Sequence, residues 1–154
     1  MKKLLILSAI MLTTLVSFTQ VKNTLHPYIG VGTSLSSNTL SYAGEVGVYN
    51  NKAWYAATVS TYDAGRTNPV YVGGKVYLKV AQHSTIDLFG YGGVSVNVDK
   101  PHNIVFEPGV AAVFNFGNFG PQVSFGLPLN ENGVLFKPLT MSLGVSVNYF
   151  FSGK

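Results

Sequence analysis

The chain has 154 residues, a formal net charge of +4 at pH 7 and no cysteine. Only 10% of its residues are charged, whereas soluble domains usually carry about 25%. The lack of cysteine excludes a disulfide framework and a thiolate metal site, and the weak, scattered positive charge argues against nucleic acid as a partner. So few charges can hardly cover a solvated surface, which favours an exterior that faces lipid.

The start of the chain has the three parts of a secretory signal peptide. Two lysines follow Met1, an apolar run extends over residues 4–16, and small residues lead to a cleavage point before Gln20. The alternative is a membrane anchor, but the run is shorter than the roughly 20 apolar residues that a spanning helix needs. We therefore expect a signal peptide at residues 1–19 and one exported domain at residues 20–154.

Beyond this leader, apolar residues alternate with small or polar ones in eight segments separated by turn-forming residues. Alternation with a period of two is the pattern of a β-strand that has two different faces. The expected strands cover residues 28–36, 40–49, 53–62, 70–80, 85–98, 104–116, 119–129 and 138–151. Helical periodicity is absent. The sequence thus predicts an all-β protein, and eight antiparallel strands can close into an up-and-down barrel without free edges.

The last segment, residues 138–151, shows this pattern most clearly. One face is entirely apolar, and the other is small and polar until it reaches Phe150. A membrane strand tilted by about 45° needs roughly 9–11 residues, so the segment is long enough to cross a bilayer. The assignment is weakest at Pro108 and Pro121, since a proline within a strand removes a ladder donor. We expect these two prolines at bulges or near strand ends.

Two kinds of eight-stranded barrel fit the alternation. A lipocalin-like soluble barrel encloses an apolar ligand with its apolar face, whereas a membrane barrel turns that face toward lipid. The polar faces carry three acids and two lysines, which would neutralise one another inside a narrow lumen. These residues are Glu45, Lys75, Lys79, Asp87 and Glu107. A solvated outer face would carry many more charges, so we expect a transmembrane barrel with a plugged lumen. The soluble ligand-binding barrel and a narrow pore remain alternatives.

Aromatic residues gather near the connections at one end of the expected barrel. Such a cluster is typical of the aromatic girdle at a membrane interface, although ordinary packing at a barrel end is the alternative. We assign the girdle to Trp54, Tyr55, Phe114, Phe116 and Phe119.

The signal peptide, the eight strands and the ending V-S-V-N-Y-F-F at residues 145–151 resemble the small outer-membrane β-barrels of Gram-negative bacteria. These are the OmpA/OmpX-like family and the Bacteroidota-type "outer membrane β-barrel protein" family. In them the barrel-assembly machinery reads a terminal aromatic residue, so the resemblance implies an assembly signal at Tyr149 and Phe151. It also implies outer-membrane lipid as the surroundings, and periplasmic termini. We expect no peptidoglycan-binding domain like that of OmpA.

The residues give little support for enzymatic chemistry. His26, His83 and His102 lie in a strand lead-in, a turn and a loop, and no serine shares a strand face with any of them. The sequence has no metal-ligand cluster, and Gly92 and Gly93 lie in a strand instead of preceding a helix, so they form no phosphate loop. We therefore expect a non-enzymatic protein without a cofactor, with a structural or envelope-maintenance role.

Overall fold

The structure is a computed structural model that describes residues 25–36, 39–62, 68–100, 103–130 and 141–151. The expected signal peptide at residues 1–19 lies outside the described residues. The strands are β1 (His26–Ser36), β2 (Thr39–Tyr49), β3 (Ala53–Tyr62), β4 (Val70–His83), β5 (Ile86–Asn97), β6 (Ile104–Phe114), β7 (Phe119–Gly126), β8 (Leu129–Asn130) and β9 (Ser142–Phe150). In the described part of the chain, no helix is long and apolar enough to span a membrane.

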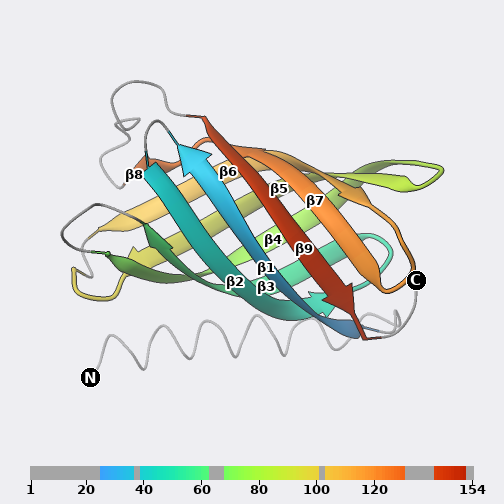
Figure 1. Ribbon diagram of the computed structural model, residues 1–154, viewed down its shortest axis with the longest axis horizontal. Coiled ribbons are helices and arrows are strands. Elements are labelled where there is room, and N and C mark those ends of the chain that lie inside the picture. Colours follow the sequence, from blue (N-terminus) through green and yellow to red (C-terminus); the bar gives the residue numbers. More distant parts are fainter. Residues whose placement is uncertain (1–24, 37–38, 63–67, 101–102, 131–140, 152–154) are drawn as a thin grey trace.

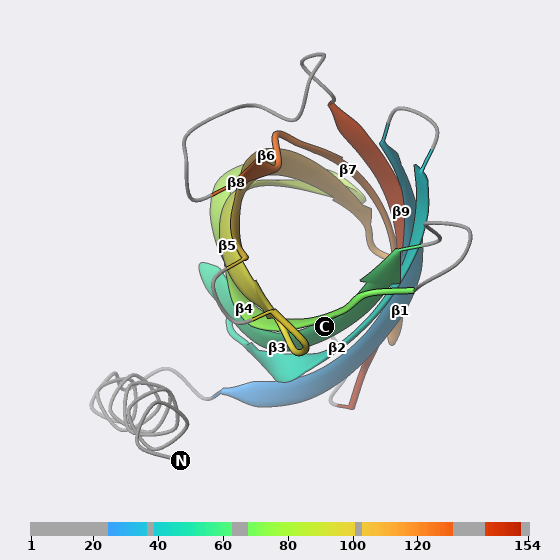
Figure 2. The same ribbon diagram turned by 90° about the vertical axis from the view of Figure 1, so that its left-hand side faces the viewer.

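The strands form one antiparallel sheet that closes on itself (Figures 1 and 2). From β1 to β7 each strand pairs with the next one in sequence, and β9 then pairs with both β7 and β1. The two-residue β8 continues β7 along β6 in the same register, so the closed ring has eight strands. This confirms the predicted all-β, eight-stranded antiparallel barrel, in which closure leaves no unpaired edge.

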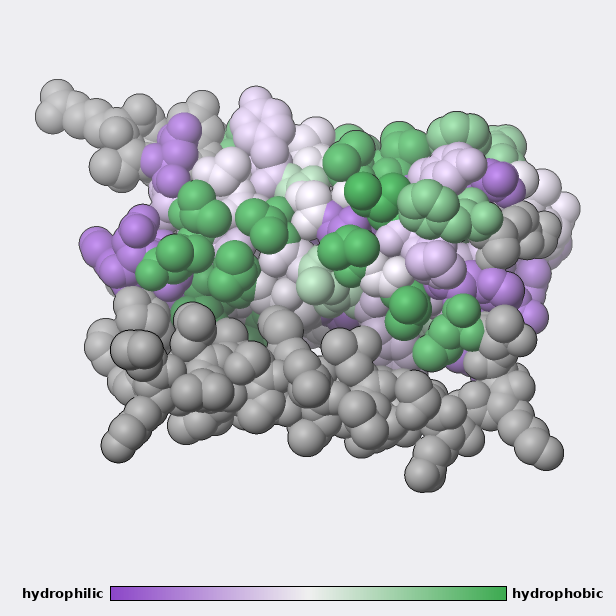
Figure 3. Space-filling view, turned by 90° about the horizontal axis from the view of Figure 1, so that it is seen from below, coloured by the Kyte–Doolittle hydropathy of each residue, from purple (hydrophilic) through white to green (hydrophobic). Residues whose placement is uncertain are grey.

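The alternation predicted from the sequence determines which side chains face inward. In β9, Leu143, Val145 and Val147 are about half exposed on the outer surface, whereas Asn148 and Phe150 are fully buried in the interior. The same division holds around the ring, and hydrophobic residues spread over the described outer surface from end to end (Figure 3). The apolar face therefore lies outside the barrel.

The two ends of the barrel differ in their connections. The short turns at residues 50–52, 84–85 and 115–118 lie at one end, together with the start of β1 and the end of β9. Backbone bonds tie these parts together, because Phe150 N–H donates to Asn118 O and Phe151 N–H donates to Pro27 O. We call this the turn end, and we call the opposite end of the barrel the loop end.

The two prolines weaken one seam of the barrel, the pairing of β6 with β7. Pro108 pairs with Gly92 in the middle of β6 without a bulge, contrary to the expectation for it, and Pro121 lies in the first half of β7. The Pro108 carbonyl accepts a bond from Leu127 N–H at 2.9 Å, so the donor that this proline lacks also faces β7. The β6–β7 ladder consequently has five paired positions, whereas every other ladder of the ring has at least eight.

The fourth strand is longer than predicted. β4 reaches His83 through a register shift between Lys79 and Ala81, and the turn that follows contains Ser84 with a positive φ of 48°. A bulge adds one residue to a single strand, so the period-two pattern that the prediction relied on breaks at this point.

Candidate functional site in the barrel interior

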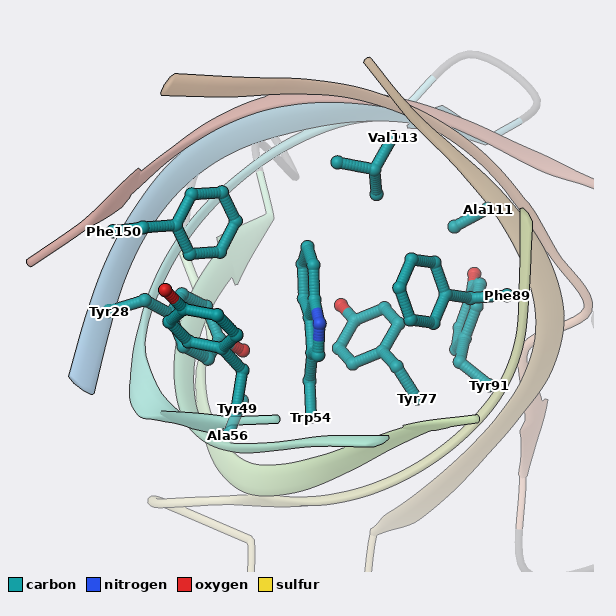
Figure 4. Packing of buried hydrophobic residues seen from close by; sticks show 10 residues of the cluster. All are labelled: Tyr28, Tyr49, Trp54, Ala56, Tyr77, Phe89, Tyr91, Ala111, Val113 and Phe150. Carbon is teal, nitrogen blue, oxygen red and sulfur yellow. The ribbon is translucent and has the colours of Figure 1, made fainter. Parts of the chain in front are cut away.

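Aromatic side chains pack across the interior at the turn end (Figure 4). They come from inward-facing positions close to the short turns, to the start of β1 and to the end of β9. We call the following six residues the aromatic cluster: Tyr28, Tyr49, Trp54, Tyr77, Phe89 and Phe150. The Trp54 ring lies between the others, with ring centroids 4.7 Å from Phe89 and 5.2 Å from Phe150.

The assignment of Trp54 to an outer girdle is wrong. This side chain is fully buried inside the barrel, whereas its neighbour Tyr55 faces outward and is half-buried. The cause is the strand geometry, because consecutive side chains of β3 point to opposite faces of the sheet. Adjacent aromatic residues in one strand therefore cannot belong to the same girdle.

The other residues assigned to the girdle lie on the outer face near the turn end. Phe116 and Phe119 are 63% and 53% exposed, and Phe114 is half-buried. Phe119 also contacts Tyr149, one of the two residues of the expected assembly signal, with ring centroids 5.2 Å apart. Tyr149 in turn contacts Phe151 at 5.3 Å, so these three rings form a continuous aromatic strip on the outer surface.

The five charged residues predicted for the lumen all lie inside the barrel, but they do not form one network. Lys79 Nζ lies 3.0 Å from Asp87 Oδ2, beside the ring of Phe89 in the aromatic cluster. Lys75 Nζ lies 3.1 Å from Glu107 Oε2. The two ion pairs are separate, and Glu45 belongs to neither of them.

Glycine explains how Lys75 reaches Glu107. The two residues stand on β4 and β6, which are not neighbours, and in the strand register Gly93 of β5 lies directly between them. Since Gly93 has no side chain, the lysine stem crosses above it; a Cβ there would lie 3.0 Å from Lys75 Cγ. Glu107 also accepts bonds from the Tyr91 hydroxyl at 3.1 Å and the Ser142 hydroxyl at 3.3 Å.

A second glycine, Gly30, lies next to polar side chains that the sequence analysis did not identify as lumen residues. Gly30 of β1 stands in register between Glu45 of β2 and Asn148 of β9. The Tyr77 hydroxyl donates to Glu45 Oε2 at 3.2 Å, and Asn148 Nδ2 donates to Gln122 Oε1 at 3.1 Å. Asn148 and Gln122 could have been identified as inward-facing polar residues, because both fall on the small, polar face of their strands.

On the loop-end side of the aromatic cluster the interior holds a cavity of about 100 Å³, which we call the vestibule. Its walls carry glycines and hydroxyl side chains, among them Ser41, Ser60, Ser95, Ser124 and Ser146. Glu45, Lys75 and Glu107 also line the vestibule, where it meets the aromatic cluster. The lumen therefore has a polar half and an aromatic half, with charged groups at the boundary.

The described residues contain no cluster of the side chains that most often hold transition metals. No group of three or more His, Cys, Asp or Glu that could hold a metal ion occurs among them. His26 is half-buried, with its ring centroid 5.6 Å from that of Tyr49, and His83 is exposed at the end of β4. His102 lies outside the described residues.

No family model matches the chain, and no curated protein matches it in sequence. Solved structures match its fold. A chain from the de novo design of transmembrane β-barrels has a TM-score of 0.55 and 20% identity, covering 85% of this chain and 98% of that one. The de novo designed TMB2.3, solved by solution NMR, has a TM-score of 0.56 and 14% identity, covering 86% and 99%.

A natural protein shares the fold as well. The crystal structure of Neisserial surface protein A matches with a TM-score of 0.52 and 13% identity, covering 82% of this chain and 96% of that one. At such low identity the likeness concerns the fold alone. The chain is thus an eight-stranded antiparallel β-barrel whose architecture is similar to that of transmembrane β-barrels.

Proposed function

We propose that the chain is a non-enzymatic β-barrel of the bacterial outer membrane, closed to ion flow, with a structural or envelope-maintenance role. The observation that carries this proposal is the aromatic cluster, because Trp54 and its neighbours fill the interior at the turn end. An eight-stranded barrel has room inside for little more than its own side chains. A lumen blocked at one end cannot serve as a channel.

The distribution of apolar surface supports the membrane location. Rows of valine and leucine face outward, with Val31 at 64% and Val46 at 61% exposure, and a row of this kind in water would invite aggregation. The soluble lipocalin-like alternative needs an apolar cavity inside the barrel. Most residues that line the vestibule are instead glycines or carry hydroxyl or charged groups, and few large apolar side chains are among them, which disfavours that alternative.

The orientation and the route of assembly are part of the same proposal. We infer that the turn end faces the periplasm, as in the OmpA/OmpX-like barrels that the sequence resembles. The aromatic strip of Phe119, Tyr149 and Phe151 would then lie at the periplasmic interface. Tyr149 and Phe151 are also the residues through which the barrel-assembly machinery would recognise the last strand.

Two measurements test this function. Membrane fractions of cells that express the full chain should contain a protein whose gel mobility shifts when the sample is boiled; recovery from the soluble fraction would contradict the membrane location. Purified barrel in a planar bilayer should show no stepwise conductance. Steady conductance by the wild-type protein would favour the narrow pore instead, and would refute the closed lumen.

A further inference from the structure

Glu45 Oε1 and Asn148 Oδ1 converge beside Gly30, at the boundary between the vestibule and the aromatic cluster, and the Tyr28 hydroxyl lies close to Glu45. All three oxygen atoms are shielded from solvent and make no hydrogen bond of ordinary length among the described residues, although Tyr28 and Glu45 lie close enough for a weak one. Asn148 and Tyr28 are fully buried as whole residues. An unpaired buried polar group is costly, so three of them in one place call for an explanation.

The missing side chain of Gly30 leaves Glu45 Oε1 and Asn148 Oδ1 facing the same place in the lumen. A Cβ built on Gly30 would lie 3.2 Å from Glu45 Oε1 and closer still to Asn148 Oδ1. Both oxygens therefore face the same point above the glycine. The Tyr28 hydroxyl is close enough to Glu45 to interact with its charge. Oxygen atoms from a carboxylate, an amide and a hydroxyl are ligands suited to hard cations.

The local charge is incomplete without a further cation. Glu45 and Glu107 contribute two negative charges to the vestibule floor, and Lys75 contributes one positive charge, which leaves a formal charge of −1. Lys75 forms its ion pair with Glu107 at 3.1 Å and acts on Glu45 only from a longer distance, and the neutral Tyr77 hydroxyl donates to Glu45. A buried carboxylate of this kind needs a cationic partner.

From these observations we propose that Glu45, Asn148 and Tyr28 bind a small monovalent cation such as sodium above Gly30. A single carboxylate matches one positive charge, whereas divalent sites in proteins commonly use several carboxylates. The vestibule surrounds such an ion with hydroxyl groups on the loop-end side, and the aromatic cluster prevents it from passing toward the turn end. The ion would bind without being conducted.

The test compares the thermal unfolding of the detergent-folded barrel in sodium chloride with that in N-methyl-D-glucamine chloride at equal ionic strength. Sodium should raise the wild-type melting temperature by several degrees, since a ligand that binds only the folded state stabilises it. Glu45→Gln should lose this response. Asp87→Asn removes a carboxylate from the other ion pair, so it should retain the response.

A second pair of variants tests whether the space above Gly30 is needed, whereas the first pair tests the charge of Glu45. Gly30→Ala places a methyl group at the proposed ion position and should abolish the sodium response. Gly44→Ala is the matched control, because a Cβ at that glycine meets no atom within 4 Å. Sodium-23 NMR on the wild-type barrel gives a direct readout, and Glu45→Gln should weaken the observed binding about tenfold or more.

An identical response in both salts, or a sodium response that survives Glu45→Gln, would overturn the proposal. An identical response would mean that a proton or a water molecule satisfies Glu45, and a surviving response would mean that sodium binds elsewhere. Ion binding at this site requires only the folded barrel, whether or not the lumen conducts. Conductance in a bilayer would therefore refute the closed lumen without removing the ion site, and loss of the sodium response would leave the closed lumen untouched.

Discussion

Replacing Lys75 by methionine should destabilise the barrel through Glu107. The variant keeps most of the lysine stem but removes the ammonium group that lies 3.1 Å from Glu107 Oε2. Removing one partner of a buried ion pair typically costs about 3–5 kcal/mol of unfolding free energy. Both side chains retain some exposure, 25% and 23%, and Glu107 keeps two hydroxyl donors. We therefore expect a loss of about 2–3 kcal/mol.

The assay is urea unfolding in detergent, followed by the fluorescence of Trp54, the single tryptophan of the chain. Its buried position in the aromatic cluster makes it a reporter of interior packing. The double variant Lys75→Met/Glu107→Gln removes both charges, so it should recover part of the stability that the single variant loses. Lys52→Met, in the exposed turn after β2, is the matched control and should change little.

Two results would refute this reasoning. An unfolding midpoint for Lys75→Met equal to that of the wild type would mean that the ion pair contributes nothing at this position. A double variant that loses the full sum of the two single losses would mean that Lys75 and Glu107 act independently, contrary to the 3.1 Å contact between them.

Three further predictions concern packing and the weak seam. Trp54→Ala should lower the free energy of unfolding by about 3–5 kcal/mol, because it leaves a cavity in the aromatic cluster, and Trp54→Phe should lower it less. The loss can be measured from the gel mobility of boiled and unboiled samples across a urea series. Gly109→Ala should destabilise the barrel by about 1–3 kcal/mol, since its Cβ would collide with the Tyr91 ring, whereas a melting temperature of Gly44→Ala near the wild-type value is expected. Amide hydrogen exchange should be faster in the β6–β7 ladder than in the β4–β5 ladder, which has more paired positions. Pro108→Ala should slow exchange in the β6–β7 ladder, because it restores a backbone donor whose hydrogen bond is worth about 1 kcal/mol. Equal exchange in the two ladders would contradict the last prediction.

The class of fold and the two faces of the barrel follow from the order of the residues alone. Side chains alternate across a strand with a period of two, so an uninterrupted pattern such as that of β9 specifies its inner and outer residues. The same rule places Trp54 inside the barrel, because it is next to the outward-facing Tyr55. It overrides the general expectation that aromatic residues near turns form a girdle. Local pattern also located the short turns, because turn residues act over a few neighbouring positions.

Which charged residues form ion pairs depends on how the strands are arranged in the closed barrel. The pairing of Lys75 with Glu107 across Gly93 depends on the order and register of three strands, and a shift of one residue would have turned either side chain outward. The convergence of Glu45 and Asn148 above Gly30 likewise depends on closure of the ring, which brings the last strand beside the first. Contacts across a closed lumen join residues that are far apart in the chain, and a local sequence pattern does not determine which of these residues come close in space.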